Sequence, residues 1–116
     1  MLTFRSKPGL VAYVTCGDPD LATSKAVILA AIDAGADVIE LGVPFSDPVA
    51  DGPVIQRASE RALKSGTSLS DVLDLAAQVR RARPDAGLII FSYLNPLLRL
   101  GLPEFVARAK AAGSRG

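Results

Sequence analysis

Histidine is absent from the 116 residues of this chain, and cysteine occurs once, at Cys16. Without histidine and with a single thiol, the chain lacks the usual zinc ligands, so we expect no metal site. One cysteine also excludes an internal disulfide and agrees with a reducing cytoplasm. Because no second thiol or basic neighbour activates Cys16, we expect it to be a small buried core residue.

The chain also lacks a strong charge of either sign and any long apolar run. Thirteen basic and twelve acidic residues give a net charge of +1, which does not indicate a nucleic acid or an anionic membrane as partner. No apolar run is long enough to cross a bilayer, and the N-terminus lacks the apolar region of a signal peptide. The apolar fraction of 49% predicts a packed core in a single domain over residues 1–116.

Three apolar segments alternate with segments of helical periodicity. We expect strands over 10–16, 36–43 and 88–93, whose composition is typical of strands buried on both faces. Helices are expected after Asp18-Pro19, from Pro53, after the Ser68/Asp71 capping box, and from about Pro103 to Ala112. This order predicts an α/β fold with a parallel sheet of right-handed βαβ units.

Several residues near the ends of these elements are expected to have structural roles only. Asp18 is predicted to cap the first helix, and Asn95-Pro96 to form a turn. A cluster of cations is expected to be the solvated end of a helix, and its members are Arg80, Arg81 and Arg83.

A sheet of three parallel strands has two unpaired edges and, with helices on one side, an apolar open face. Either helices cover both faces or another chain supplies the missing half. We therefore expect the chain to form a homo-oligomer, as a dimer or a larger assembly.

The second strand carries Glu40 between Ile39 and Leu41. Burying an ionised carboxylate among apolar groups is costly unless the group is paired or its pKa rises, and a raised pKa suits acid–base chemistry near neutrality. Asp51, at the far end of the next loop, supplies a second carboxylate in different surroundings. Two such groups can take two different proton-transfer roles.

Side-chain alternation predicts which residues share a face with Glu40. Val38 and Gly42 lie on its face, whereas Ile39, Leu41 and Val43 face the helices. The same rule groups Tyr93 with Phe91 on the third strand, and Tyr13 with Val11 and Thr15 on the first. Gly42 leaves room for a planar ring. Glu40 and Tyr93 lie toward the carboxyl ends of their strands, where barrel enzymes place their chemistry.

Residues 40–56, with the sequence ELGVPFSDPVADGPVIQ, resemble the signature of the tryptophan synthase alpha subunit family. Segments 13–19 (YVTCGDP) and 92–96 (SYLNP) support the resemblance, which extends from about residue 10 to residue 113. It implies a partial TIM (β/α)8 barrel, comprising the first three βα units, either rearranged or completed by oligomerisation.

The resemblance also implies an activity, the retro-aldol cleavage of indole-3-glycerol phosphate to indole and glyceraldehyde 3-phosphate in tryptophan biosynthesis. It makes Glu40 the general acid–base at indole C3 and the glycerol hydroxyl, and Asp51 the group that holds the indole N–H proton. The implied substrate-binding residues are Tyr93, Tyr13, Phe91 and Gly42.

The partner that the resemblance implies is a beta subunit, which carries pyridoxal phosphate and consumes the indole, while the alpha chain itself needs no cofactor. The implied interface residues are Pro44 and Asp47. The family's glycine-rich phosphate loops come from the later half of the barrel and are absent from this sequence. We therefore expect little or no lyase activity from the chain alone, because substrate positioning is lost.

Each of these residues also has a structural interpretation. Glu40 can be an ion-pair partner of Arg5 or Lys7, Asp51 can cap the following helix, and Asp47 can be a turn former. The aromatic residues can be ordinary core residues.

Two other interpretations of the whole chain are retained. One is a related phosphosugar barrel enzyme of tryptophan or histidine biosynthesis, against which the ordered loop from Phe45 to Asp51 argues. The other is a structural barrel fragment that folds or associates but catalyses nothing.

Overall fold

The computed structural model describes residues 9–45 and 52–113. Three strands, β1 (Val11–Thr15), β2 (Val38–Gly42) and β3 (Gly87–Phe91), form a parallel sheet with β2 in the centre. The predicted parallel α/β order is confirmed, although each strand is shorter than predicted. The helices are α1 (Leu21–Asp33), α2 (Pro53–Lys64), α3 (Leu69–Ala82), α4 (Leu94–Leu100) and α5 (Leu102–Ala111).

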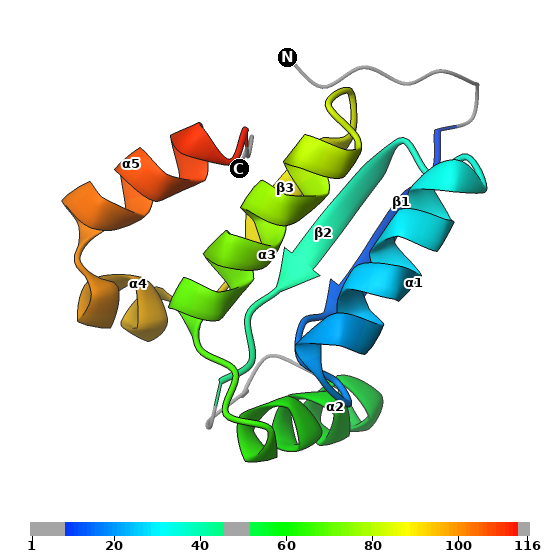
Figure 1. Cartoon of the computed structure of the whole chain (residues 1–116). Helices are drawn as coiled ribbons and strands as arrows, with labels where there is room; N and C mark the ends of the chain where they lie inside the picture. Colours follow the sequence, from blue (N-terminus) through cyan, green and yellow to red (C-terminus); the bar gives the residue numbers. More distant parts are fainter. Residues whose placement is uncertain (1–8, 46–51, 114–116) are drawn as a thin grey trace.

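The hydrophobic core lies between one face of the sheet and two helices. Helices α1 and α3 lie side by side over this face (Figure 1). Ile39 and Leu41 of β2 point into the core, as predicted from side-chain alternation, and so do Leu88 and Ile90 of β3. Fully buried helix residues that pack there include Ile28, Val72, Ala76 and Val79.

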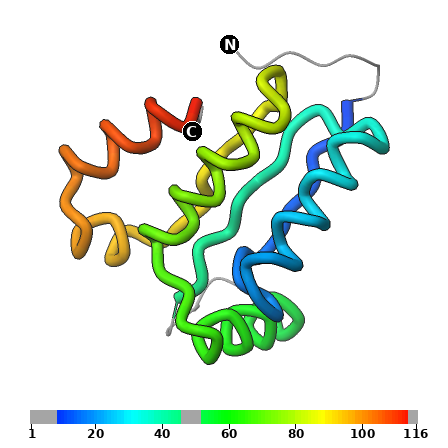
Figure 2. Tube along the Cα trace, in the orientation of Figure 1, coloured from blue at the N-terminus to red at the C-terminus, as the bar shows by residue number. Residues whose placement is uncertain are grey.

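The remaining helices lie at the margins of the sheet. Helix α2 lies at the carboxyl ends of the strands and contacts β1, whereas α4 and α5 follow β3 and contact α3 (Figure 2). In the described part of the chain, no helix is long and apolar enough to cross a membrane.

The opposite face of the sheet is open along parts of its two outer strands, whereas Val38 of the central strand, on the same face, is only 2% exposed. Val11, Tyr13 and Phe91 point to this side and are 45%, 36% and 47% exposed. The helices among residues 9–45 and 52–113 thus cover one face only, so the doubly covered alternative is wrong for the described chain. The homo-oligomer stays a prediction.

Local capping explains where α2 and α3 begin. Pro53 occupies the first turn of α2, where its missing N–H costs nothing. Helix α3 begins with the predicted capping box, in which Ser68 and Asp71 satisfy each other's backbone N–H groups. Both helix starts are confirmed.

The predicted cap of the first helix is wrong. Helix α1 begins at Leu21, and its N-cap is Asp20, whose Oδ1 accepts a hydrogen bond of 2.7 Å from the Thr23 backbone N–H. This hydrogen bond stabilises the carboxylate and lowers the pKa of Asp20. Asp18 instead accepts two hydrogen bonds from Arg61 of α2.

The turn predicted at Asn95-Pro96 is also wrong, because both residues lie in α4. Pro96 fits there because the first turn of a helix does not need its N–H.

The arginines at the end of α3 are more than a solvated helix end. Arg83 donates two hydrogen bonds of 2.7 Å to the carboxylate of Asp33, and Arg80 donates to the carbonyl oxygens of Ala112 and Gly113. The predicted solvated end is therefore wrong for Arg80, whereas Arg83 is paired and still lies at the surface, with its side chain 37% exposed. Arg81 is exposed, as predicted.

Candidate active site

Glu40 lies in the middle of the open face of the sheet. Its neighbours in the register are Tyr13 of β1 on one side and Ile89 of β3 on the other. Glu40 is half-buried. Its two neighbours along the strand, Ile39 and Leu41, are buried core residues that point to the other face. Among the described residues no ion pair includes Glu40, and Arg5 and Lys7 lie outside them. The site therefore offers a carboxylate between a tyrosine and an isoleucine, with no described ion-pair partner.

Two aromatic side chains meet beside this carboxylate. The rings of Tyr13 and Phe91 form an edge-to-face pair with centroids 5.6 Å apart. Gly42 lies in the row between Thr15 and Phe91, and a Cβ atom there would lie 2.2 Å from the Tyr13 hydroxyl oxygen. The missing side chain of Gly42 is thus the space that Tyr13 fills. The structure brings Tyr13, Phe91 and Gly42 together, and the room that Gly42 was predicted to leave for a planar ring holds the ring of Tyr13 instead.

Tyr93 is not part of the Tyr13–Phe91 pair and contacts a different ring. The third strand ends at Phe91, so strand alternation does not extend to Tyr93, which is the N-cap of α4. Its ring stacks on that of Phe45, with centroids 5.2 Å apart and an interplanar angle of 29°. This stack joins the segment after β2 to the segment after β3. Its partners are 48 positions apart in the chain, so no local sequence signal could have revealed it.

The loop after β2 is described only in part. Pro44 is buried and Phe45 is half-buried, whereas the predicted residues Asp47 and Asp51 lie outside the described residues. The N-cap of α2 is Gly52, and the capping role considered for Asp51 lies outside the described residues.

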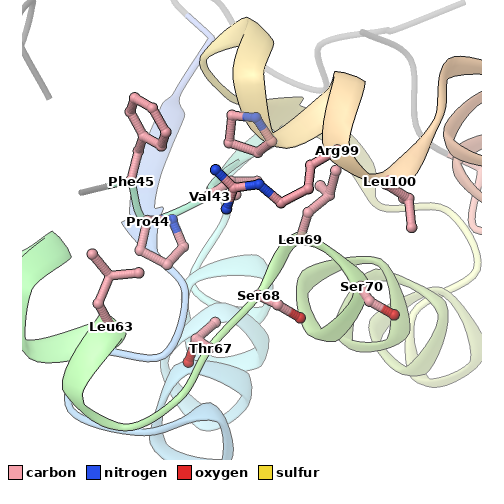
Figure 3. A pocket seen from close by; sticks show the side chains of 11 residues that line it. Val43, Pro44, Phe45, Leu63, Thr67, Ser68, Leu69, Ser70, Arg99 and Leu100 are labelled. Atoms are coloured by element: carbon pink, nitrogen blue, oxygen red, sulfur yellow. The ribbon is translucent and has the colours of Figure 1, made fainter. Parts of the chain in front are cut away.

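A pocket of about 400 Å³ lies at the carboxyl end of β2, on the side of the helices rather than on the face of Glu40. Figure 3 shows the Arg99 side chain reaching from α4 toward Val43 and Pro44. The lining is mostly apolar and consists of Val43, Pro44, Phe45, Leu63, Thr67, Ser68, Leu69, Ser70, Pro96, Arg99 and Leu100. Glu40, Tyr13 and Phe91 are not part of it, because their face of the sheet is an open surface.

Cys16 is completely buried at the end of β1, as predicted, and burial raises its pKa to about 12. The thiol is therefore neutral at physiological pH and takes no part in acid–base chemistry. Within the described ranges, no three acidic, cysteine or histidine side chains gather where a metal ion could bind.

Comparisons with known proteins show which family the chain is similar to. The model of the family described as tryptophan synthase alpha chain matches residues 2–116. Curated alpha chains include one from Desulfosudis oleivorans, 50% identical over 115 residues, which are 99% of this chain and 43% of the relative. Another, from Chromobacterium violaceum, is 51% identical over 110 residues, or 95% of this chain and 42% of the relative.

The chain is also similar in structure to solved alpha subunits. The alpha subunit from Legionella pneumophila superposes with a TM-score of 0.90 at 42% identity, covering 93% of this chain and 41% of that chain. A mutant alpha subunit from Pyrococcus furiosus gives a TM-score of 0.87 at 42% identity, covering 93% and 43%. The described fold is therefore part of the TIM barrel of these proteins, and the chain spans less than half the length of the relatives it matches.

Proposed function

The chain belongs to the tryptophan synthase alpha chain family, and from that premise we propose that it carries the acid–base part of an active site for the cleavage of indole-3-glycerol phosphate. The observation that carries the proposal is the place of Glu40, half-buried and in register with Tyr13 on the open face. The products are indole and glyceraldehyde 3-phosphate, and the reaction belongs to tryptophan biosynthesis.

The proposed chemistry needs two carboxyl groups. Asp51 takes the proton from the indole nitrogen while Glu40 donates one to indole C3, which gives the indolenine tautomer. Glu40, now a carboxylate, accepts the proton of the glycerol hydroxyl next to C3. The carbon–carbon bond then breaks, its electron pair returns to the ring, and Asp51 gives the proton back to the nitrogen. The proton count balances, so we propose that the chain needs no cofactor of its own.

The aromatic residues fit the planar part of this substrate. Tyr13 and Phe91 expose ring surface beside Glu40, and exposed rings favour stacked or edge-on contacts with an indole. We propose that these two residues, with the ring of Tyr13 seated over Gly42, form one wall of the indole site. We propose that Tyr93, which follows β3 as the N-cap of α4 and stacks on Phe45, supplies a further side of the indole site.

We further propose that the segment from Pro44 to Asp47 contacts a beta subunit that carries pyridoxal phosphate and consumes the indole. Pro44 lines a pocket at the carboxyl end of β2, the end at which barrel enzymes carry their chemistry. A partner seated there would lie next to the proposed site. The reducing cytoplasm is the proposed location, since Cys16 is a single thiol.

The test of the reaction is complementation. The chain is mixed with a second polypeptide that carries the remaining βα units of an alpha subunit, and indole and glyceraldehyde 3-phosphate are measured. We expect equal amounts of both products from the mixture and almost none from the chain alone. An assembled mixture, verified by its mass, that releases no indole contradicts the proposal.

The test of the residue uses Glu40→Gln in the same mixture, with Glu104→Gln as the matched control. Glu104 is an exposed residue of α5, so its replacement removes an equal charge from a helix at the margin of the sheet. We expect Glu40→Gln to lower kcat by roughly a hundredfold or more, the usual loss of a general acid–base. Equal rates for the two variants would exclude Glu40 from the chemistry.

One observation favours a second candidate function, a barrel fragment without activity. Apolar side chains on the open face, among them Val11 and Phe91, are about half exposed. Such a face favours association over catalysis. Complementation separates the candidates, because this second interpretation predicts assembly of the mixture without product.

A further inference from the structure

We propose that Asp18 and Arg61 are positioning residues for the proposed reaction. Their ion pair, together with the hydrogen bonds around Gly17, holds α2 against the carboxyl end of β1. It thereby fixes where α2 begins, at Gly52 and Pro53. The inference rests on the proposed function, because Asp51 immediately precedes Gly52 in the sequence.

The ion pair has the geometry of a fixed contact. Nε of Arg61 donates to Oδ1 of Asp18 at 2.7 Å, and its Nη2 donates to Oδ2 at 3.0 Å. Two parallel hydrogen bonds fix the orientation of both groups as well as their distance. The Asp18 side chain is only 18% exposed, which limits its screening by solvent. The Arg61 side chain is 55% exposed, and the hydrogen bond to Asp18 raises the pKa of its guanidinium.

Gly17 forms the second part of the contact. Its backbone N–H donates to Oγ of the buried Ser24 in α1 at 2.9 Å, and its carbonyl oxygen lies 3.0 Å from Oγ of Ser65, whose single hydroxyl proton it shares with the carbonyl oxygen of Ala62 at 2.7 Å. Thr67 packs directly on Gly17, since a Cβ there would lie 1.9 Å from the Thr67 Oγ1. The backbone after β1 is therefore fixed on one side by α1 and on the other by the end of α2.

These contacts lie at the last turns of α2, yet they orient its start. From Arg61 back to Pro53 the helix spans only about 12 Å at 1.5 Å per residue, and a helix of this length is stiff. The first backbone bond of the helix, from the Gln56 N–H to the Gly52 carbonyl, carries this orientation to Gly52.

The end of β1 is in turn joined to β2, because the Cys16 N–H donates to the carbonyl oxygen of Gly42 at 3.0 Å. Gly42 follows Glu40 by two residues on the same face of the sheet. A continuous chain of contacts therefore relates the start of α2 to the strand that carries Glu40. A small displacement of a reacting group lowers the rate strongly, so a contact of this kind affects catalysis without touching substrate.

The first experiment measures amide hydrogen exchange by NMR in the 116-residue chain. We expect Arg61→Gln and Asp18→Asn to accelerate exchange of the Gln56 amide by about threefold to tenfold, while the core amides of α3 keep their rates. Arg57→Gln is the matched control, because it removes the same charge from an exposed position of α2. An equal change in Arg57→Gln, or none in Arg61→Gln, overturns the proposed contact.

The second experiment measures indole formation in the complemented mixture. We expect Arg61→Gln to lower kcat by about tenfold with KM within about twofold, and the exchanged pair Asp18→Arg with Arg61→Asp to recover much of that loss. If wild type forms indole and Arg61→Gln matches it in kcat, the positioning role is wrong while the proposed function stands. If the assembled wild type forms no indole, the proposed function fails and this role fails with it, whatever the exchange rates show.

Discussion

At the scale of single residues, two glycines are required for different reasons. Gly17 has a φ of +93° and also lies against Thr67, so a side chain there meets both backbone strain and a close neighbour. Gly42 needs only space, because the ring that would meet its Cβ is the partly exposed Tyr13, which can swing away. The first glycine therefore matters for stability and the second for the shape of the proposed site.

This difference predicts unequal costs for the same substitution. Gly17→Ala should lower the free energy of unfolding by at least about 1 kcal/mol more than Gly35→Ala, because only the first must also displace a packed side chain. Gly35 is the matched control, with a φ of +113° and no atom within 4 Å of the place that a Cβ would take. Urea unfolding of both variants measures the difference, and equal losses would show that Thr67 does not restrict Gly17.

The buried thiol of Cys16 predicts how the free energy of unfolding changes at alkaline pH. Its pKa is raised by burial from 9.0 to about 12, so the folded state resists losing the proton more than the unfolded state does. The stabilisation is complete below 9.0 and declines as the pH rises toward 12. We expect Cys16→Ser to reduce this decline in the free energy of unfolding. An unchanged pH profile in the variant would show that the thiol is not responsible.

At the scale of elements, the helix starts show what the sequence could predict. The capping box of Ser68 and Asp71 and the proline that opens α2 are local signals, and both predictions were correct. The roles of Asp18 and Arg83 could not be predicted, since their partners are 43 and 50 residues away. Helix α4 was missed because Pro96 resembles a turn former unless the chain before it is already known to start a helix.

The candidate site likewise has features that local sequence signals predict and features that depend on residues far apart in the chain. Alternation within a short strand was enough to place Gly42 on the face of Glu40, whereas the register of β1 with β2 is needed to place Tyr13 beside them. It failed at Tyr93, because it needed the strand to continue beyond Phe91 and the strand ends there. The stack of Tyr93 on Phe45 depends on how two loops approach each other, which only the folded chain reveals.

The N-cap of α1 predicts how the free energy of unfolding changes at acidic pH. The pKa of Asp20 is lowered chiefly by the backbone hydrogen bond from Thr23. The ionised cap therefore stabilises the folded state fully at a pH above the ordinary pKa of the carboxyl group. This stabilisation is lost as the pH falls through the lowered pKa. Asp20→Asn keeps a good cap but cannot titrate. We expect its free energy of unfolding to fall less steeply on acidification than that of wild type. Parallel acid profiles for the two proteins would contradict this origin of the effect.

At the scale of the whole molecule, the open face dominates the behaviour of the chain. Apolar residues of β1 and β3 are exposed on this face, and Leu94 and Leu98 of α4 are exposed as well. Apolar surfaces of this kind favour association, and the two outer strands also offer unpaired edges.

We therefore expect the chain to self-associate in a manner that depends on concentration. Sedimentation equilibrium should give a mass above 12.1 kDa at high concentration, approaching the monomer on dilution. Phe91→Ser should weaken the association, because it removes a ring that is 47% exposed on the open face. Val54→Ser is the control, since this exposed apolar residue lies on α2, away from that face. A wild-type chain that stays monomeric at millimolar concentration contradicts the expectation.

The central claim is that the face carrying Glu40 is open while the opposite face holds the core, and thiol labelling tests it most directly. Phe91→Cys and Ile90→Cys place a thiol at adjacent positions that are 47% and 7% exposed, against the fully buried Cys16 as background. In dilute solution, where self-association is weakest, we predict that the thiol at 91 is labelled at least about a hundredfold faster than the thiol at 90. Equal rates, or faster labelling at position 90, would contradict the assignment of the two faces.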